Sequence, residues 1–227
     1  LKDVRLIGTA WPGHFNKIIA ETMYANIERV GLPEWTEDDQ RFARATQGEV
    51  GGAQTGLATE LSRLRPAPTE AQRTAGYADD IGDISWNVPT ATLSYPSNMP
   101  GLPGHNWANA IAMATPIAHK GATQGALAQS MTLLDFMVRP DLVEAAWDYF
   151  RDVQTADLQY TPFIRPTDQP AIEMNAGILD EFREDMRKFY YDSDRYVSYL
   201  DQLGVSYPTL RQPDGRCTIG SVSEQQG

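Results

Sequence analysis

Histidine is the side chain in this sequence best suited to bind a metal ion or to move a proton at neutral pH. Two of the three histidines, His105 and His119, lie within the same stretch, residues 77–121. His105 follows a Pro-Gly pair, with a strand-like pattern before it and a helical pattern after it. Loops at strand ends gather ligand-binding groups in α/β proteins. The spacing leaves two roles open for His105: metal ligand, or hydrogen-bonded surface histidine.

His119 lies near the expected start of a helix that begins after Pro116. The positive end of a helix dipole disfavours imidazolium, so the ring would stay neutral and able to ligate or to accept a proton. The alternative is a histidine that bonds a nearby backbone carbonyl at the helix start. Both interpretations remain open, and His105 is the better candidate for a metal ligand.

An acidic turn, residues 79–83, lies upstream of these histidines. The carboxylates of Asp80 and Asp83 could orient a histidine or a substrate group through hydrogen bonds. The turn could equally be a solvated one in which Asp83 caps the following segment. The third histidine, His14, stands with Asn16 at the turn between a first strand and a first helix. We weigh a role at an interface for this pair against helix capping.

The elements that must position these residues follow from hydrophobic periodicity and from Gly and Pro punctuation. Residues 3–11 are rich in β-formers and predict a strand, and residues 14–30 carry a helical apolar stripe. Thr36 is followed by three acidic residues, which predicts an N-capped helix that ends near residue 47. Residues 84–95 predict one or two short strands. This alternation indicates an α/β fold.

The second half of the sequence is mainly helical in pattern. Helices are expected over 116–138, 141–153, 178–190 and 194–203, and the tail 208–227 is expected to be loose. Small residues at the start of the first of these helices should let it approach a neighbour closely. Earlier in the chain, residues 48–76 are interrupted by Gly and Pro and predict a long excursion.

Composition excludes several classes of protein. The formal charge of −11 and the pI near 4.7 over 227 residues argue against binding to nucleic acid. No apolar run approaches the roughly 20 residues that cross a bilayer, so no membrane partner is expected. The one cysteine, Cys217, rules out an intrachain disulfide or a thiolate zinc cluster. These features suit a reducing compartment, and we expect a cytoplasmic protein.

The stretch 77–121 also resembles a known family. The residues that carry the resemblance are Asp80, Asp83, Trp86, Pro89, Gly104, His105, His119, Lys120 and Gly121. In type and order they resemble the C-terminal part of the metal-dependent amidohydrolases that include aminoacylase and glutamate carboxypeptidase. Within that family they are most similar to the aminobenzoyl-glutamate hydrolase branch. The resemblance is best over residues 1–155.

The resemblance implies a fold, a domain division and a chemistry. Residues 1–12 would end an inserted α+β lid or dimerisation domain, and 13–227 would form the C-terminal part of a zinc-peptidase-like catalytic domain. The family hydrolyses the amide bond of N-acyl or N-aroyl amino acids with two divalent ions, zinc or manganese. In it the last metal ligand is a histidine in such a loop, and His105 matches it. His119, Asp80, Asp83, His14 and Asn16 would be substrate-binding or supporting residues.

The family's remaining ligands and its catalytic glutamate come from an N-terminal half. No His-x-Asp pattern and no Glu-Glu pair occur in these 227 residues. We therefore expect this chain to supply only part of the site, and to need the N-terminal half of the same enzyme or a partner chain. The expected assembly is a homo- or heterodimer. The alternatives are a non-catalytic assembly protein that retains the fold, and a small-molecule binding module without metal.

Overall fold

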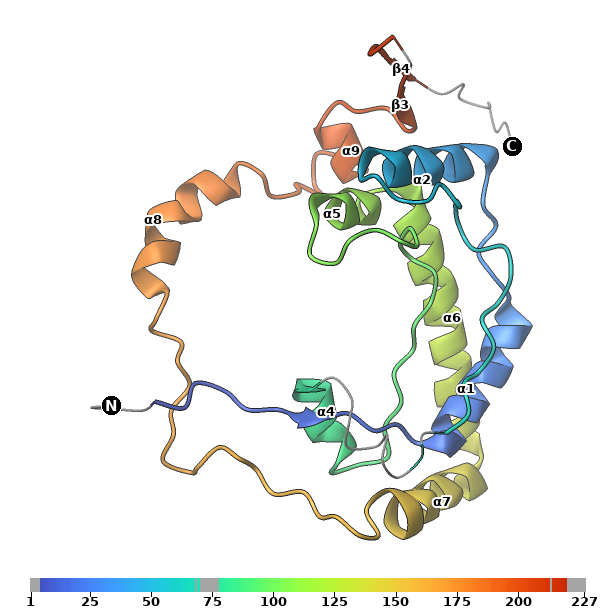
Figure 1. Ribbon diagram of the computed structural model, residues 1–227, viewed down its shortest axis with the longest axis vertical. Coiled ribbons are helices and arrows are strands. Elements are labelled where there is room, and N and C mark those ends of the chain that lie inside the picture. Colours follow the sequence, from blue (N-terminus) through green and yellow to red (C-terminus); the bar gives the residue numbers. More distant parts are fainter. Residues whose placement is uncertain (1–4, 68, 70–77, 213, 220–227) are drawn as a thin grey trace. The chain divides into compact units, whose positions relative to one another are not determined.

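Helices make up most of the regular structure in the computed structural model of this protein (Figure 1). The structure describes residues 5–67, 69, 78–212 and 214–219. These residues divide into two compact units that each combine three stretches of sequence. The first unit comprises 1–27, 63–93 and 129–189, and the second comprises 28–62, 94–128 and 190–227. Each unit is described by itself below.

The first unit is built around the start of helix α1 (Lys17–Val30) and the short helix α4 (Asp80–Ser85). Strand β1 (Trp11–Pro12) pairs antiparallel with β2 (Ala78–Asp79). Further along the chain come α7 (Pro140–Tyr149), the π-helical turn η1 (Phe150–Gln154) and α8 (Ala176–Arg187). The helix expected over 141–153 is confirmed as α7 followed by η1. The helix expected over 178–190 is confirmed as α8, which begins two residues earlier and ends three residues earlier than expected.

The strand expected over 3–11 is wrong for residues 5–10, which have no regular structure. Trp11 is fixed by side-chain packing instead of a long ladder. Its ring stacks on Phe163 at a centroid distance of 5.1 Å and lies 5.1 Å from Trp86, and its Nε1 donates to the carbonyl of Thr161. Pro12 has no N–H to give to a ladder, which limits the strand to two residues.

The strands expected over 84–95 are also absent from the described residues. Residues 84–85 end α4, and 86–95 run without regular structure. Pro89 interrupts the stretch, and its carbonyl-side neighbour Thr90 accepts a hydrogen bond from the backbone of Asn16 rather than from a strand. Trp86 is buried and donates from Nε1 to Pro12, so one side-chain bond holds this segment in place.

The second unit contains α2 (Glu37–Glu49), α5 (Trp107–Met113) and the start of α6 (Pro116–Val138), and Figure 1 shows α2 beside α5. Its core cluster is Ala43, Leu57, Met99, Ala112 and Ile117, with Trp35, Phe42 and Leu102 packed against it. The predicted helices at α2 and α6 are confirmed. Thr36 caps α2 as expected, in a capping box with Asp39.

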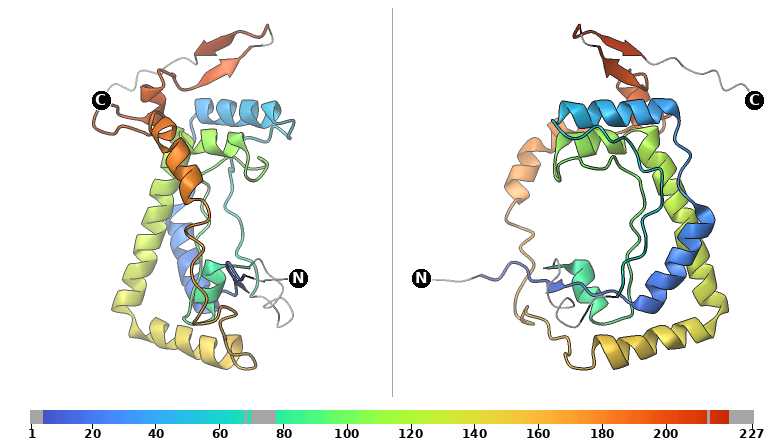
Figure 2. Two further views of the ribbon diagram at one scale, coloured as in Figure 1. Left: turned by 90° about the vertical axis from the view of Figure 1, so that its left-hand side faces the viewer. Right: turned by 45° about the vertical axis from the view of Figure 1, so that its right-hand side comes forward.

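Two features of the second unit differ from expectation. The helix expected over 194–203 is only the single turn α9 (Tyr199–Gln202). The tail holds an antiparallel hairpin of β3 (Thr209–Arg211) and β4 (Cys217–Ile219), seen most clearly in Figure 2. The excursion expected over 48–76 begins as the end of α2 and is irregular over 50–67, and most of the rest of it lies outside the described residues.

The close approach predicted for the start of α6 is present at Gly121. A Cβ at this position would overlap the carbonyl oxygen of Pro96 and the Cα of Ser97. Only glycine lets the helix and this segment meet. Among the described residues no helix is long and apolar enough to span a membrane.

Candidate functional site

His105 lies on an exposed loop immediately before α5. Its backbone has φ 51°, a left-handed conformation that is uncommon for a residue with a side chain. The neighbours fix the loop: the side chain of Asn106 caps α5 by accepting from the N–H of Ala108, and Asn109 Nδ2 donates to the carbonyl of Pro103 at 2.6 Å. The structure thus holds an exposed imidazole on a tethered turn.

His119 lies in the first turn of α6, as the sequence predicts, and is exposed. Its backbone N–H approaches the carbonyl of Thr115 at 3.4 Å. The side chain of the next residue, Lys120, binds within the protein. Its Nζ donates to Asp39 Oδ2 at 2.6 Å and to the carbonyl of Glu34 at 3.0 Å. In the His-Lys-Gly triplet the lysine therefore binds the protein itself, and Gly121 permits packing.

Asp39 is a buried carboxylate that sequence reasoning did not identify as special. Besides Lys120 it accepts from the hydroxyl of Tyr207 at 2.9 Å and from the backbone N–H of Thr36 at 2.9 Å. Burial raises the pKa of Asp39, but the hydrogen bonds from Lys120, Thr36 and Tyr207 outweigh it, and the net pKa is lowered. The sequence signal that could have pointed to Asp39 is the pattern Thr-x-x-Asp at residues 36–39, because this pattern is typical of a capping box.

The acidic turn lies in the first unit, where it begins helix α4. Asp79 caps α4 by accepting from the N–H of Gly82 at 2.7 Å. The alternative interpretation, in which Asp83 is the capping residue, was therefore wrong. Asp83 is half-buried and accepts a hydrogen bond from Tyr160, whose pKa is raised by desolvation and by this bond. Asp80 is exposed.

His14 and Asn16 form a buried polar cluster in the first unit. Asn16 Oδ1 accepts from the N–H groups of Ile18 and Ile19, so within this pair it is Asn16 that fulfils the capping role. Asn16 Nδ2 donates to Gln154 Oε1 at 2.8 Å. Gln154 Nε2 then faces His14 Nδ1 at 3.1 Å as a donor, which makes Nδ1 the acceptor nitrogen of the ring. The His14 ring packs on Trp86 with centroids 4.0 Å apart.

The predicted site residues thus fall into two groups. His105 and His119 belong to the second unit, whereas Asp80, Asp83, His14 and Asn16 belong to the first. Within the described residues no group of three or more His, Cys, Asp or Glu side chains could hold a metal ion. By themselves, the described residues therefore do not fit a two-metal centre, and His105 is one exposed imidazole that other ligands would have to join.

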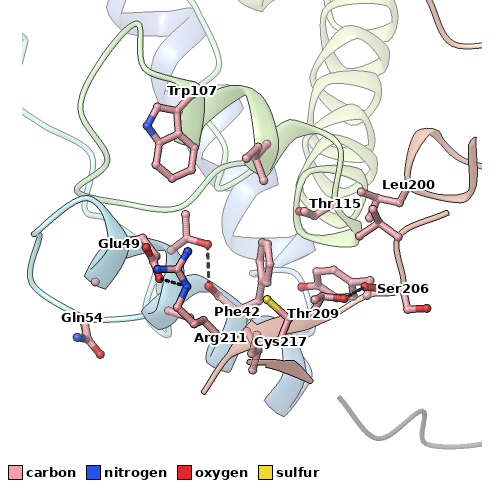
Figure 3. A pocket seen from close by; sticks show the side chains of 17 residues that line it. Phe42, Glu49, Gln54, Trp107, Thr115, Leu200, Ser206, Thr209, Arg211 and Cys217 are labelled. Carbon is pink, nitrogen blue, oxygen red and sulfur yellow. Dashed lines mark hydrogen bonds and ion pairs between the residues drawn. The ribbon is translucent and has the colours of Figure 1, made fainter. Parts of the chain in front are cut away.

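A hollow of about 840 Å³ lies in the second unit (Figure 3). It is bounded by one face of α2, by α5 with Thr115, and by the segment from Leu200 through the β3–β4 hairpin. Its walls include the rings of Phe42, Trp107 and Tyr207, and Arg211 lies at an ion-pair distance from Glu49. Trp107 is two residues after His105, so their Cα atoms are within about 7 Å of each other.

Comparison with curated proteins identifies a distant likeness. The chain is similar to the B component of the p-aminobenzoyl-glutamate hydrolase of Escherichia coli (strain K12). The two are 25% identical over 168 residues, which cover 65% of this chain and 35% of that protein. The chain thus spans about a third of the length of this curated relative. No family model matches the chain, and no solved structure matches it. The comparison supports a distant relationship to the amidohydrolases.

Proposed function

We propose that this chain is part of an amidohydrolase that cleaves the amide bond of N-acyl or N-aroyl amino acids of the aminobenzoyl-glutamate kind. The observation that carries the proposal is the 25% identity to a component of the p-aminobenzoyl-glutamate hydrolase. The resemblance of residues 77–121 to the same family, in which a loop histidine is a metal ligand, agrees with it. Residues 1–12 then end the lid domain, and 13–227 belong to a zinc-peptidase-like catalytic domain.

In this proposal His105 is the metal ligand that the chain contributes. An exposed imidazole on a turn tethered by Asn106 and Asn109 is accessible to an ion bound by other groups. The remaining ligands for two divalent ions, zinc or manganese, come from the N-terminal half of the same enzyme or from a partner chain in a dimer. His119, also exposed, is assigned to the substrate side of the site.

The test combines metal content and activity in one set of proteins. The complete enzyme, which includes the half or the partner chain that supplies the remaining ligands, is incubated with p-aminobenzoyl-glutamate, release of p-aminobenzoate is followed, and bound metal is measured by mass spectrometry. His105→Ala should lose more than about a hundredfold in activity together with bound metal, because loss of one ligand opens the site. The matched variant His119→Ala should retain metal and lose only rate or substrate affinity. Full metal occupancy and near-normal turnover in His105→Ala would refute the assignment.

A second candidate function is assembly without catalysis, and helix α8 favours it. None of the residues of α8 is buried, and its apolar side chains Ile178, Phe182 and Met186 are 57%, 52% and 44% exposed. An amphipathic helix with an uncovered apolar face is typical of an interaction surface. A wild-type protein that forms a defined complex but neither binds metal nor releases p-aminobenzoate would favour this function over hydrolysis.

A further inference from the structure

The hollow in the second unit has walls suited to an aromatic ring. Trp107 and Ile111 line it with 54% and 44% of their surface exposed, although both are large apolar side chains. Phe42 and Tyr207 also line the hollow, and their ring centroids are 5.2 Å apart. Apolar and aromatic walls with a few polar groups are the usual lining of small-molecule sites, and a volume near 840 Å³ lies in their size range.

One wall is fixed before any ligand arrives. The hydroxyl of Tyr207 donates to Asp39 at 2.9 Å, and Lys120 holds the same carboxylate at 2.6 Å. The Tyr207 ring therefore cannot swing into the hollow without breaking a bond to a buried charge. A ring held in this way provides a binding surface without a cost of ordering at the moment of binding.

The charged side chains of the hollow are one acid and one base, close together. Arg211 Nε lies 3.6 Å from Glu49 Oε1, too far for a hydrogen bond, and the two side chains are 65% and 46% exposed. Each therefore keeps bonding capacity for a ligand. An α-amino acid presents an ammonium and a carboxylate on the same carbon, so it matches two neighbouring opposite charges. A purely anionic or purely cationic ligand would leave one of them facing a like charge.

We propose that this hollow binds a free aromatic α-amino acid. The ring packs against Trp107, Phe42 and Tyr207, the carboxylate binds Arg211, and the ammonium binds Glu49. Charge-assisted hydrogen bonds of this kind are about twice as strong as neutral ones, so they select for both charges of the ligand. The site needs no metal, and its occupancy is separate from the amide hydrolysis proposed above.

Calorimetric titration of the purified protein with L-phenylalanine, L-tyrosine and L-tryptophan tests the proposal. At least one should bind with saturation at one site. Phenylalanine amide lacks the carboxylate and N-acetyl-phenylalanine lacks the ammonium, so each should bind at least about tenfold more weakly than phenylalanine. Glycine, a zwitterion without a ring, should not bind measurably.

Variants locate the binding in this hollow. Arg211→Gln and Glu49→Gln should each weaken binding about tenfold or more, and Trp107→Ala should abolish it. Arg216→Gln on the same hairpin and Glu28→Gln on α1 are matched exposed controls that should bind as the wild type does. The substituted charges are at the surface, so circular dichroism should be unchanged. Failure of all three amino acids to bind, or wild-type affinity in both charge variants, would overturn the proposal.

Discussion

Lys120 Nζ and Asp39 Oδ2 lie 2.6 Å apart, although 81 residues separate them in the sequence. The carboxylate is 1% exposed and the lysine side chain 33% exposed, so the pair brings one charge fully out of water. The pair joins the start of α6 to the first turn of α2. Lys120 therefore stabilises the second unit, whereas the side chain of its neighbour His119 is exposed.

Removing the lysine should destabilise the protein. Lys120→Met leaves a buried carboxylate with only Thr36 and Tyr207 as partners, and we expect a loss of about 2–3 kcal/mol, below the range for a fully buried pair because Lys120 reaches solvent. Urea unfolding measures this. Lys188→Met removes an exposed pair with Asp185 and should cost less than about 1 kcal/mol. An equal loss of unfolding free energy in the two variants would mean that the buried pair stabilises the protein no more than the exposed pair does.

Asp39 should make stability dependent on acid pH. Its folded pKa is lowered below the unfolded value, so its contribution is present above about pH 4 and is lost as the pH falls through the folded pKa. The urea midpoint, measured between pH 3 and pH 7, should fall less steeply in Asp39→Asn than in the wild type. Identical slopes would show that Asp39 does not contribute to the acid transition.

Tyr207 should act in the opposite pH range. Burial, followed by its bond to Asp39, raises its pKa, so the folded state holds the hydroxyl proton more tightly than the unfolded state does. Its contribution is therefore present below the unfolded pKa of about 10 and is lost at higher pH. Tyr207→Phe should reduce the loss of stability above pH 10. Tyrosinate absorbance should show one fewer tyrosine that ionises only on unfolding in the variant than in the wild type.

Two helical glycines should respond in opposite ways to alanine. Gly121→Ala places a methyl group against the backbone of Pro96 and Ser97 and should cost about 1–3 kcal/mol or more. Gly177→Ala, in α8, meets nothing within 4 Å and should stabilise by about 0.5–1 kcal/mol. Thermal unfolding of both variants checks the contrast. A neutral Gly121→Ala would mean that α6 does not approach this segment closely.

His105 offers a test that separates function from stability. Its left-handed backbone costs a non-glycine residue about 1 kcal/mol, so His105→Gly should raise the free energy of unfolding by up to that amount. The same variant should lose metal and amidohydrolase activity if His105 is a ligand. A variant that is less stable than the wild type would indicate that the imidazole holds the loop itself.

Local signals in the sequence predicted the elements that local energetics control. Thr36 with the acidic residues after it marked the start of α2, and Pro116 and Pro140 marked the starts of α6 and α7. Helices form hydrogen bonds within one segment, so capping and periodicity suffice to place them. The strand predictions failed over 5–10 and 84–95 because a strand requires a partner elsewhere in the chain, which the segment does not specify.

The sequence by itself therefore determined the main helices, the loop position of His105 and the place of His119 at a helix start. It also carried the resemblance of residues 77–121 to the amidohydrolases. Only the tertiary structure decided that Lys120 and Tyr207 share the carboxylate of Asp39, and that Trp107 and Arg211 line one hollow. The hydrogen bonds of Lys120 and Tyr207 to Asp39 span 81 and 168 positions of the sequence, respectively. Such pairings depend on packing of the whole unit rather than on any local pattern.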